Sequence, residues 1–406
     1  MPSTLPDGDA APADGSLPSG ALVGAADRPL GIYLHVPFCT TRCGYCDFNT
    51  YTADELGGGV SRTTYVDTAL AELRFARGVL AGDNRAVSTV FVGGGTPTLL
   101  PARDLGRFLD GVRELFGLAP DAEVTTESNP ESVDAAALTE LRAAGFTRVS
   151  FGMQSAQEHV LAVLDRQHTP GRVDEVVGDA RAAGFDHISV DLIYGTPGES
   201  DGDWRASVRA AIGTGADHVS AYSLIVEPGT RLAARVARGQ LPMPDDDVLA
   251  DRYSIADEML GAAGFTWYEV SNWARSDDDQ CRHNLLYWTG GDWWGVGPGA
   301  HSHVGGVRWW NVKHPAPYTE RVTTHASPAH AREQLDGAAR HTEHVMLRLR
   351  LRDGLPLGTL TPAGRSAAGQ ACADGLLEPE AFDAGRAVLT RRGRLLADAV
   401  VRAILD

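Results

Sequence analysis

Three cysteines lie within eight residues of one another, in the order Cys39-x3-Cys43-x2-Cys46. Thiolates at this spacing can converge on one inorganic centre, and soft thiolates select zinc, Cu(I) or iron–sulfur clusters. A structural zinc site usually has four ligands in two pairs, and no fourth cysteine is nearby. Three thiolates on a four-iron cluster leave one iron open for another ligand. The spacing favours an iron–sulfur cluster; the alternatives are a zinc site completed by His35, or three unligated thiols.

A second chemical feature is the glycine-rich segment 93–97, which reads GGGTP and follows an apolar run. Glycine has no Cβ and tolerates positive φ, so the backbone at such a segment can approach a ligand closely. A glycine run alone marks an ordinary tight turn in most proteins. Beside the cysteine triad it indicates a ligand pocket.

The elements that must position these residues alternate in type between residues 30 and 225. The β-rich runs are 31–36, 89–92, 123–126, 148–151, 187–193 and 218–224, and helical patterns include 64–80, 102–116, 133–144 and 203–214. This alternation predicts an α/β fold with a parallel sheet and right-handed crossovers. Functional residues then belong at the carboxyl ends of the strands, where the cysteines, the glycine-rich segment, Glu127, Gln154 and Asp191 all fall.

The composition limits what the protein does. The chain has 406 residues, 43% of them hydrophobic, and a formal net charge of −17, which argues against a nucleic-acid binder. Lys313 is the single lysine, so a Walker-type phosphate loop is excluded. Five cysteines are too few for a disulfide framework and fit a cytoplasmic protein. No apolar stretch is long enough for a membrane span, so small ligands or a specific protein are the expected partners.

The organisation along the chain is predicted in four parts. Residues 1–28 are rich in Pro, Gly, Ala, Ser and Asp and are expected to be a disordered tail. The core is assigned to 29–235. Residues 236–335 are expected to be a linker or extension, and they hold seven of the eight tryptophans. Residues 336–406 are expected to form a small α+β domain, winged-helix-like.

The cysteine motif after a first strand, with a glycine-rich loop after the second, resembles the radical S-adenosylmethionine (SAM) family. The resemblance implies a partial (β/α)6 barrel and a [4Fe-4S] cluster whose open iron binds SAM. It is closest to the subfamily of oxygen-independent coproporphyrinogen III dehydrogenases and their haem-chaperone relatives, and covers the chain from residue 33 onward. By this resemblance, the SAM-contacting positions are Tyr33, Tyr45, Gly94, Gly95, Thr96, Glu127, Gln154, Arg166 and Asp191.

The chemistry of these side chains suits parts of SAM. Glu127 or Asp191 can bind ribose hydroxyls, and Gln154 can orient the polar end. Arg166 can pair with the SAM carboxylate, and the Tyr45 ring can pack on adenine. The structural alternatives are strand-end caps for the two carboxylates and a surface salt bridge for Arg166.

Phe48 distinguishes the two branches of this subfamily. The dehydrogenases carry a fourth cysteine two residues after the third, whereas this chain has Cys46-Asp47-Phe48. A phenylalanine cannot ligate iron. The resemblance is therefore to the haem-chaperone branch.

Residues 283–288 match the HNxxYW motif that is associated with haem binding in that branch, with His283, Asn284, Tyr287 and Trp288 as the motif residues. A histidine nitrogen is a good axial ligand for haem iron, and aromatic rings suit a flat macrocycle. The alternatives are a hydrogen-bonded loop and tryptophans that belong to the core. His301 and His303 are competing ligand candidates, and Cys281 and Cys372 have no assigned role.

The function predicted from these features is a haem chaperone that holds haem, a [4Fe-4S] cluster and SAM and transfers haem to an acceptor apoprotein. A coproporphyrinogen III dehydrogenase acting by radical oxidative decarboxylation is the first alternative. A radical SAM enzyme for another tetrapyrrole or a protein side chain is the second.

Overall fold

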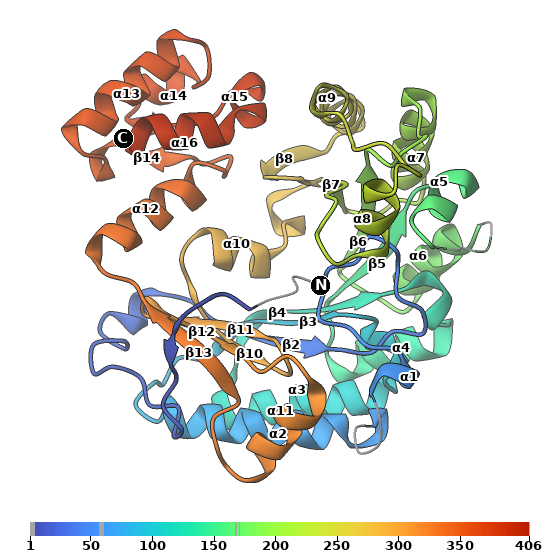
Figure 1. Cartoon of the computed structure of the whole chain (residues 1–406), viewed down its shortest axis with the longest axis vertical. Helices are drawn as coiled ribbons and strands as arrows, with labels where there is room; N and C mark the ends of the chain where they lie inside the picture. The colour runs from blue at the N-terminus through green and yellow to red at the C-terminus, as the bar shows by residue number, and fades with distance from the viewer. Residues whose placement is uncertain (1–4, 57–60, 167–168, 170, 406) are drawn as a thin grey trace.

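Six parallel strands form the centre of the structure, a computed structural model that describes residues 5–56, 61–166, 169 and 171–405 (Figure 1). They are β2 (Leu30–Val36), β3 (Val87–Gly94), β4 (Leu118–Ser128), β5 (Arg148–Gln154), β6 (His187–Tyr194) and β7 (His218–Ser223), and they neighbour one another in chain order. This order confirms the predicted partial (β/α)6 barrel. Ile32 and Leu34 on β2 are fully buried because helices cover the outer face of the sheet.

Helices connect the strands and pack on the sheet. They are α1 (Ala53–Leu56), α2 (Arg62–Val79), α3 (Ala102–Phe116), α4 (Ala135–Ala144), α5 (Glu158–Val163), α6 (Arg172–Ala182) and α7 (Asp201–Gly213). Local signals set their ends. For example, Ser200 and Asp203 form a capping box at the start of α7, each side chain accepting from the other residue's backbone N–H. The expected helices thus agree with the structure to within two residues at each end.

The sheet continues on both sides of these six strands. The added strands described next come from residues that follow β7 in the sequence. On one side β10 (Asp292–Val296) pairs parallel with β2, and β11 (His301–Val304), β12 (Val307–Asn311) and β13 (Ala329–Gln334) follow antiparallel. On the other side β9 (Asn272–Ala274) pairs antiparallel with β7, and β8 (Thr266–Glu269) lies outside it. Among the described residues the sheet has thirteen strands.

The segment expected to be a linker, 236–335, therefore belongs largely to the same sheet as the core. Its helices are α9 (Asp246–Ala262), α10 (Arg282–Trp288) and α11 (Pro315–Thr323), and α8 (Arg231–Ala237) spans its start. Five of its tryptophans are buried: Trp267, Trp273, Trp294, Trp309 and Trp310. The tryptophan-rich composition thus reflects packing of the sheet extension.

The N-terminal segment also differs from expectation. Composition predicted a disordered tail over 1–28, but in the described part β1 (Asp9–Ala10) pairs antiparallel with β13. The Ser327 N–H donates to the Ala13 carbonyl over 2.8 Å, and Ala21 is buried. The open edge of β13 supplies hydrogen-bond partners that composition cannot reveal.

The C-terminal residues form a separate small core. It consists of α12 (Gly337–Arg348), α13 (Pro362–Ala373), α14 (Pro379–Asp383), α15 (Arg391–Leu395) and α16 (Ala397–Leu405), with β14 (Leu355–Pro356) paired to β15 (Arg386–Ala387). Arg394 anchors it to α9 by donating from both terminal nitrogens to the carboxylate of Asp257, over 3.0 and 2.9 Å. No helix in the described residues is long and apolar enough to cross a membrane.

Candidate functional site

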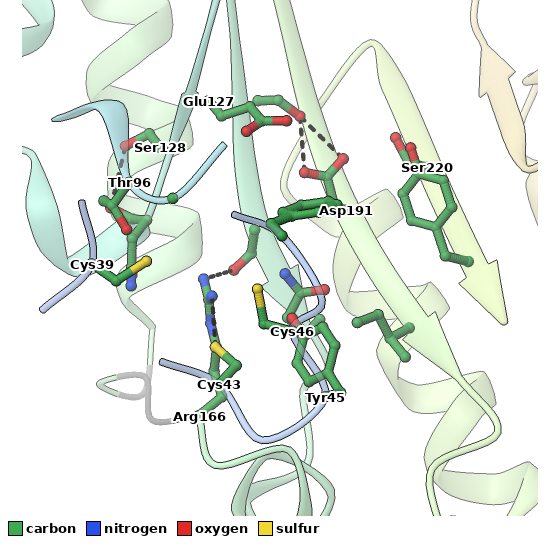
Figure 2. A pocket seen from close by; sticks show the side chains of 18 of the residues that line it. Cys39, Cys43, Tyr45, Cys46, Thr96, Glu127, Ser128, Arg166, Asp191 and Ser220 are labelled. Atoms are coloured by element: carbon green, nitrogen blue, oxygen red, sulfur yellow. Dashed lines mark hydrogen bonds between the residues drawn. The ribbon is translucent and has the colours of Figure 1, made fainter. Parts of the chain in front are cut away.

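The loop after β2 lies at the carboxyl ends of the parallel strands, where it borders a cavity of about 1640 Å³ (Figure 2). All three predicted cysteines, Cys39, Cys43 and Cys46, line this cavity. The loop after β3 packs closely against them: a Cβ on Gly95 would lie 2.4 Å from the Phe38 carbonyl oxygen and 3.0 Å from the sulfur of Cys39. Glycine is therefore required at this position, as the glycine-rich segment predicted.

The three thiols are partly buried, and burial raises the pKa of Cys39 to about 11. Within the described ranges, no group of three histidine, cysteine or carboxylate side chains is placed to hold a single metal ion. Both ring nitrogens of His35 are engaged, with the Tyr33 hydroxyl at 3.0 Å and the Asn49 carbonyl at 2.8 Å. This arrangement does not support the zinc alternative. Three thiols bordering an open space fit a larger, multi-iron cluster.

Two half-buried carboxyl groups line the cavity from β4 and β6, the strands on either side of β5. Glu127 accepts from the Gly94 N–H over 2.9 Å, and Asp191 accepts from the Ser150 hydroxyl at 3.1 Å. Burial, reinforced by the charge of Asp191, raises the pKa of Glu127 to about 8. Burial also raises the pKa of Asp191, to about 6. Both carboxyl groups are therefore easier to protonate than free ones, and their oxygens are suited to bind hydroxyl groups.

Gln154 and Arg166 complete the polar wall. Gln154 ends β5 with φ of 64°, a left-handed conformation that non-glycine residues rarely adopt, next to an irregularity in the pairing with β6. Arg166 donates to the Gly152 carbonyl over 2.7 Å and lies 3.7 Å from the sulfur of Cys43. The guanidinium is thus held beside the cysteine loop, where a carboxylate ligand would meet it.

Most of the predicted SAM positions come together in this cavity. The lining residues among them are Tyr45, Gly94, Gly95, Thr96, Glu127, Gln154, Arg166 and Asp191. Tyr33 is different, because it does not line the cavity. Its ring instead stacks against Phe91 and His283, with centroids 6.2 and 6.4 Å away.

The HNxxYW motif occupies α10, which lies against β3. His283 is 1% exposed, and its ring stacks on Phe91 with centroids 5.2 Å apart. Its Nδ1 is 2.8 Å from the Thr89 hydroxyl and its Nε2 is 2.7 Å from the Tyr287 hydroxyl. Both ring nitrogens are therefore engaged within the protein in this arrangement.

The other candidate haem residues are also engaged with the protein. Asn284 is the motif residue that lines the cavity, and its amide lies 3.4 Å from Glu269. The side chain of Trp288 also bonds to Glu269. His303 has both ring nitrogens bonded to backbone groups, and His301 stacks on Trp310.

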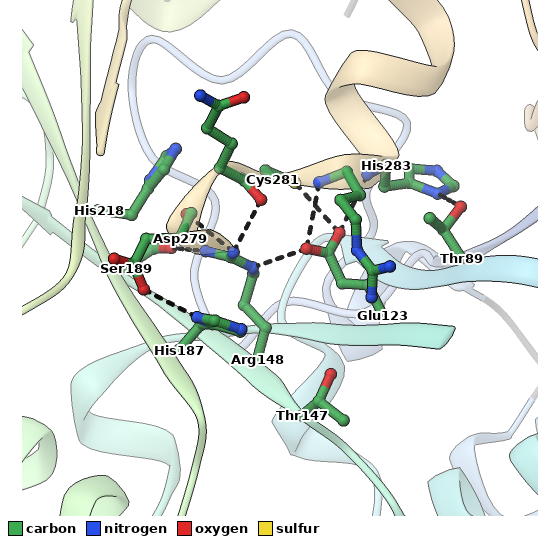
Figure 3. Close-up of polar contacts among 12 residues, drawn as sticks. Thr89, Glu123, Thr147, Arg148, His187, Ser189, His218, Asp279, Cys281 and His283 are labelled. Carbon is green, nitrogen blue, oxygen red and sulfur yellow. Dashed lines mark hydrogen bonds and ion pairs between the residues drawn. The ribbon is translucent and has the colours of Figure 1, made fainter. Parts of the chain in front are cut away.

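A buried ion pair that sequence analysis missed anchors α10 to the barrel (Figure 3). Glu123 and Arg148, each at most 2% exposed, pair at 3.1 Å. Glu123 also accepts from the backbone N–H groups of Arg282 and His283, at 3.1 and 3.0 Å. Burial alone would raise the pKa of Glu123, but Arg148 and these N–H groups lower it. The signal was present in the sequence as a charged residue at the start of each of the expected strands 123–126 and 148–151.

Residues 33–211 match the family model described as the radical SAM superfamily. The "Heme chaperone HemW" of Mycobacterium tuberculosis (strain ATCC 25618 / H37Rv) is 57% identical to this chain over 378 residues, which cover 93% of this chain and 95% of the relative. The chain belongs to the HemW family of radical SAM proteins. The HemW protein of Escherichia coli (strain K12) is 39% identical over 276 residues, covering 68% of this chain and 70% of that one.

The fold of this HemW-family chain is shared with a solved enzyme structure. The coproporphyrinogen III oxidase HemN from Escherichia coli, described as a radical SAM enzyme, superposes with a TM-score of 0.81 over 97% of this chain and 94% of that one. The two are 23% identical, so this likeness shows the fold alone. Membership in the radical SAM superfamily implies a [4Fe-4S] cluster and SAM as cofactors. The cysteine loop and the polar wall of the cavity fit both.

Proposed function

We propose that this protein is a cytoplasmic haem chaperone that carries a [4Fe-4S] cluster and SAM, binds haem and passes it to acceptor apoproteins. The observation that carries the proposal is the 57% identity to a HemW haem chaperone over 93% of the chain.

Cys39, Cys43 and Cys46 would hold the cluster through their thiolates, because they border one cavity on a single loop. The eight lining residues of the predicted SAM set would hold SAM. The Glu127 and Asp191 pair would meet hydroxyl groups, and the Arg166 guanidinium would meet a carboxylate. When bound, the cluster supplies one-electron chemistry at SAM.

Phe48 supports a chaperone in preference to a dehydrogenase. It follows the third cysteine by two residues, and its side chain is exposed and lines the cavity. An aromatic ring offers no ligand at the position where the dehydrogenases carry a cysteine, so the cluster loop provides three thiolates.

The test is anaerobic reconstitution of the full chain with iron, sulfide and SAM, followed by parallel assays on one preparation. Haem titration should shift the Soret band with saturable stoichiometry, and the loaded protein should convert apomyoglobin, used as a model acceptor, to the holo form. Coproporphyrinogen III should stay unconverted. Conversion to protoporphyrinogen, or no saturable Soret change, would refute the proposal.

A further inference from the structure

The mouth of the cysteine-lined cavity carries an unusual concentration of exposed apolar side chains. Among the described residues, nine large apolar side chains are exposed, and three of them line this one cavity. They are Phe48 at 55%, Tyr222 at 43% and Ile225 at 62% exposure. Scattered single apolar residues on a surface need no explanation, but several around one concavity mark a binding surface.

Ile225 is exposed although the segment that carries it is well packed. Its neighbours Leu224 and Val226 pack into a small apolar cluster with Leu232, and the Leu224 N–H donates to the Tyr194 carbonyl over 2.8 Å. The same segment therefore has a fixed backbone and one side chain turned away from its core. A pre-formed apolar contact of this kind costs little ordering when a ligand covers it.

The cavity has space for a ligand in addition to SAM. A pocket for one drug-sized molecule measures about 300–1,000 Å³, whereas this cavity measures about 1640 Å³. The predicted SAM contacts Glu127 and Asp191 lie on β4 and β6. The mouth is formed by other segments, namely the end of the cysteine loop at Phe48 and the chain at and beyond the end of β7 at Tyr222 and Ile225.

A cation lies beside this apolar surface. Arg231 lines the cavity at the start of α8, and its side chain is largely exposed. Its guanidinium donates to the Arg42 carbonyl and lies 3.6 Å from Asp165, and the side chain is still 60% exposed. The helix is fixed to the cysteine loop because the Leu232 N–H donates to the Gly44 carbonyl over 2.8 Å. A flat apolar molecule with carboxylate substituents would meet both the rings and this cation.

Haem is a flat apolar molecule with carboxylate substituents. The other candidate haem surface, on α10, is not accessible in this structure. His283 is buried with both nitrogens engaged, so α10 would have to separate from β3 before its histidine could reach iron. We infer that haem binds at the mouth of the cavity, with its macrocycle against Phe48, Tyr222 and Ile225 and a propionate near Arg231, an inference that rests on the proposed function. Cluster, SAM and haem would then share one continuous cavity.

The test compares apolar residues of equal exposure inside and outside the cavity. Ile225→Ser changes a mouth residue, and Met243→Ser is the matched control, because Met243 is also 62% exposed but does not line the cavity. Haem titration of the reconstituted full chain should give an at least tenfold weaker Kd for Ile225→Ser and an unchanged Kd for Met243→Ser. Phe48→Ser should weaken haem binding similarly, and iron content is measured alongside because Phe48 is close to Cys46.

The outcomes separate this inference from the proposed function. Wild-type protein that binds no haem would refute both. If the wild-type protein binds haem and both Ile225→Ser and Phe48→Ser leave the Kd unchanged, the haem site at the mouth is overturned. The proposed chaperone function would still stand. Equal weakening by Met243→Ser would show non-specific surface association and would also overturn it. Urea unfolding of each variant verifies that the apolar-to-serine changes leave the fold intact.

Discussion

The buried Glu123–Arg148 pair makes a strong prediction about stability. Glu123→Gln preserves the shape of the side chain but removes the charge that compensates the Arg148 guanidinium. Arg148 also donates to the Ser189 hydroxyl and to the carbonyls of Asp279 and Gln280, so it cannot swing out to water. Breaking a buried pair costs about 3–5 kcal/mol. We expect about 3 kcal/mol, because the glutamine oxygen still accepts one of the hydrogen bonds.

The control variant changes Asp121, which lies on β4 like Glu123 and also contacts α10. Asp121 pairs with Arg282 at 3.0 Å, but both side chains are largely exposed. Asp121→Asn should therefore cost less than about 1 kcal/mol. Urea unfolding followed by tryptophan fluorescence gives both values, because most of the tryptophans are buried in the sheet extension that α10 adjoins.

The pH dependence gives a second readout. The pKa of Glu123 is lower in the folded protein than its ordinary value of 4.5. Its contribution to stability is therefore present above about pH 4.5 and is lost as the pH falls through the folded pKa. The difference in the free energy of unfolding between wild type and Glu123→Gln should be largest near pH 7 and should become smaller below pH 4.5. A Glu123→Gln protein no less stable than Asp121→Asn at pH 7 would show that the pair contributes no net stability.

Three further predictions concern the cluster loop, the cavity and the C-terminal domain. Cys43→Ser should lose most of its reconstituted iron and sulfide by chemical analysis, whereas Cys372→Ser, in the C-terminal domain, should keep the wild-type content; equal content in both would refute the triad. Because burial raises the pKa of Glu127 to about 8, its contribution to stability is lost as the pH rises from about 4.5 to about 8. Glu127→Gln should therefore show a shallower decline in urea midpoint over this range, and parallel curves would contradict the raised pKa. Asp257→Asn removes the bidentate partner of Arg394 and should speed limited proteolysis between the two cores; an unchanged cleavage rate would show that the ion pair does not hold the C-terminal domain in place.

The sequence predicted the central strands because short runs rich in apolar and β-branched residues alternate with helical patterns. β6 was expected at 187–193 and is observed at His187–Tyr194. Because parallel strands end at one edge, the positions of Glu127, Gln154 and Asp191 at the cavity also followed from pattern alone. The position of the cysteine loop at the cavity could be predicted in the same way, because the loop directly follows the first strand.

The features that local patterns did not reveal are contacts between segments far apart in the chain. One is the contact of the Tyr33 ring with His283 on α10. The N-terminal segment has a composition typical of disorder, and it is ordered by the free edge of β13. Strands such as β9 and β11 are too short for a periodic signal, so their joining to the central sheet was not foreseen. Edge pairing and helix docking depend on tertiary partners that local patterns do not encode.

The pairing of β10 with β2 and of β9 with β7 has a consequence for how the chain folds during synthesis. When the ribosome has made residues 30–223, the six parallel strands exist, but β2 and β7 have no neighbours on their outer sides. Unpaired strand edges of this kind readily join other chains. Both edges are covered after residues 266–296 emerge. A fragment ending near residue 235, where composition suggested a domain boundary, should therefore aggregate, and the nascent barrel depends on its own later sequence for protection.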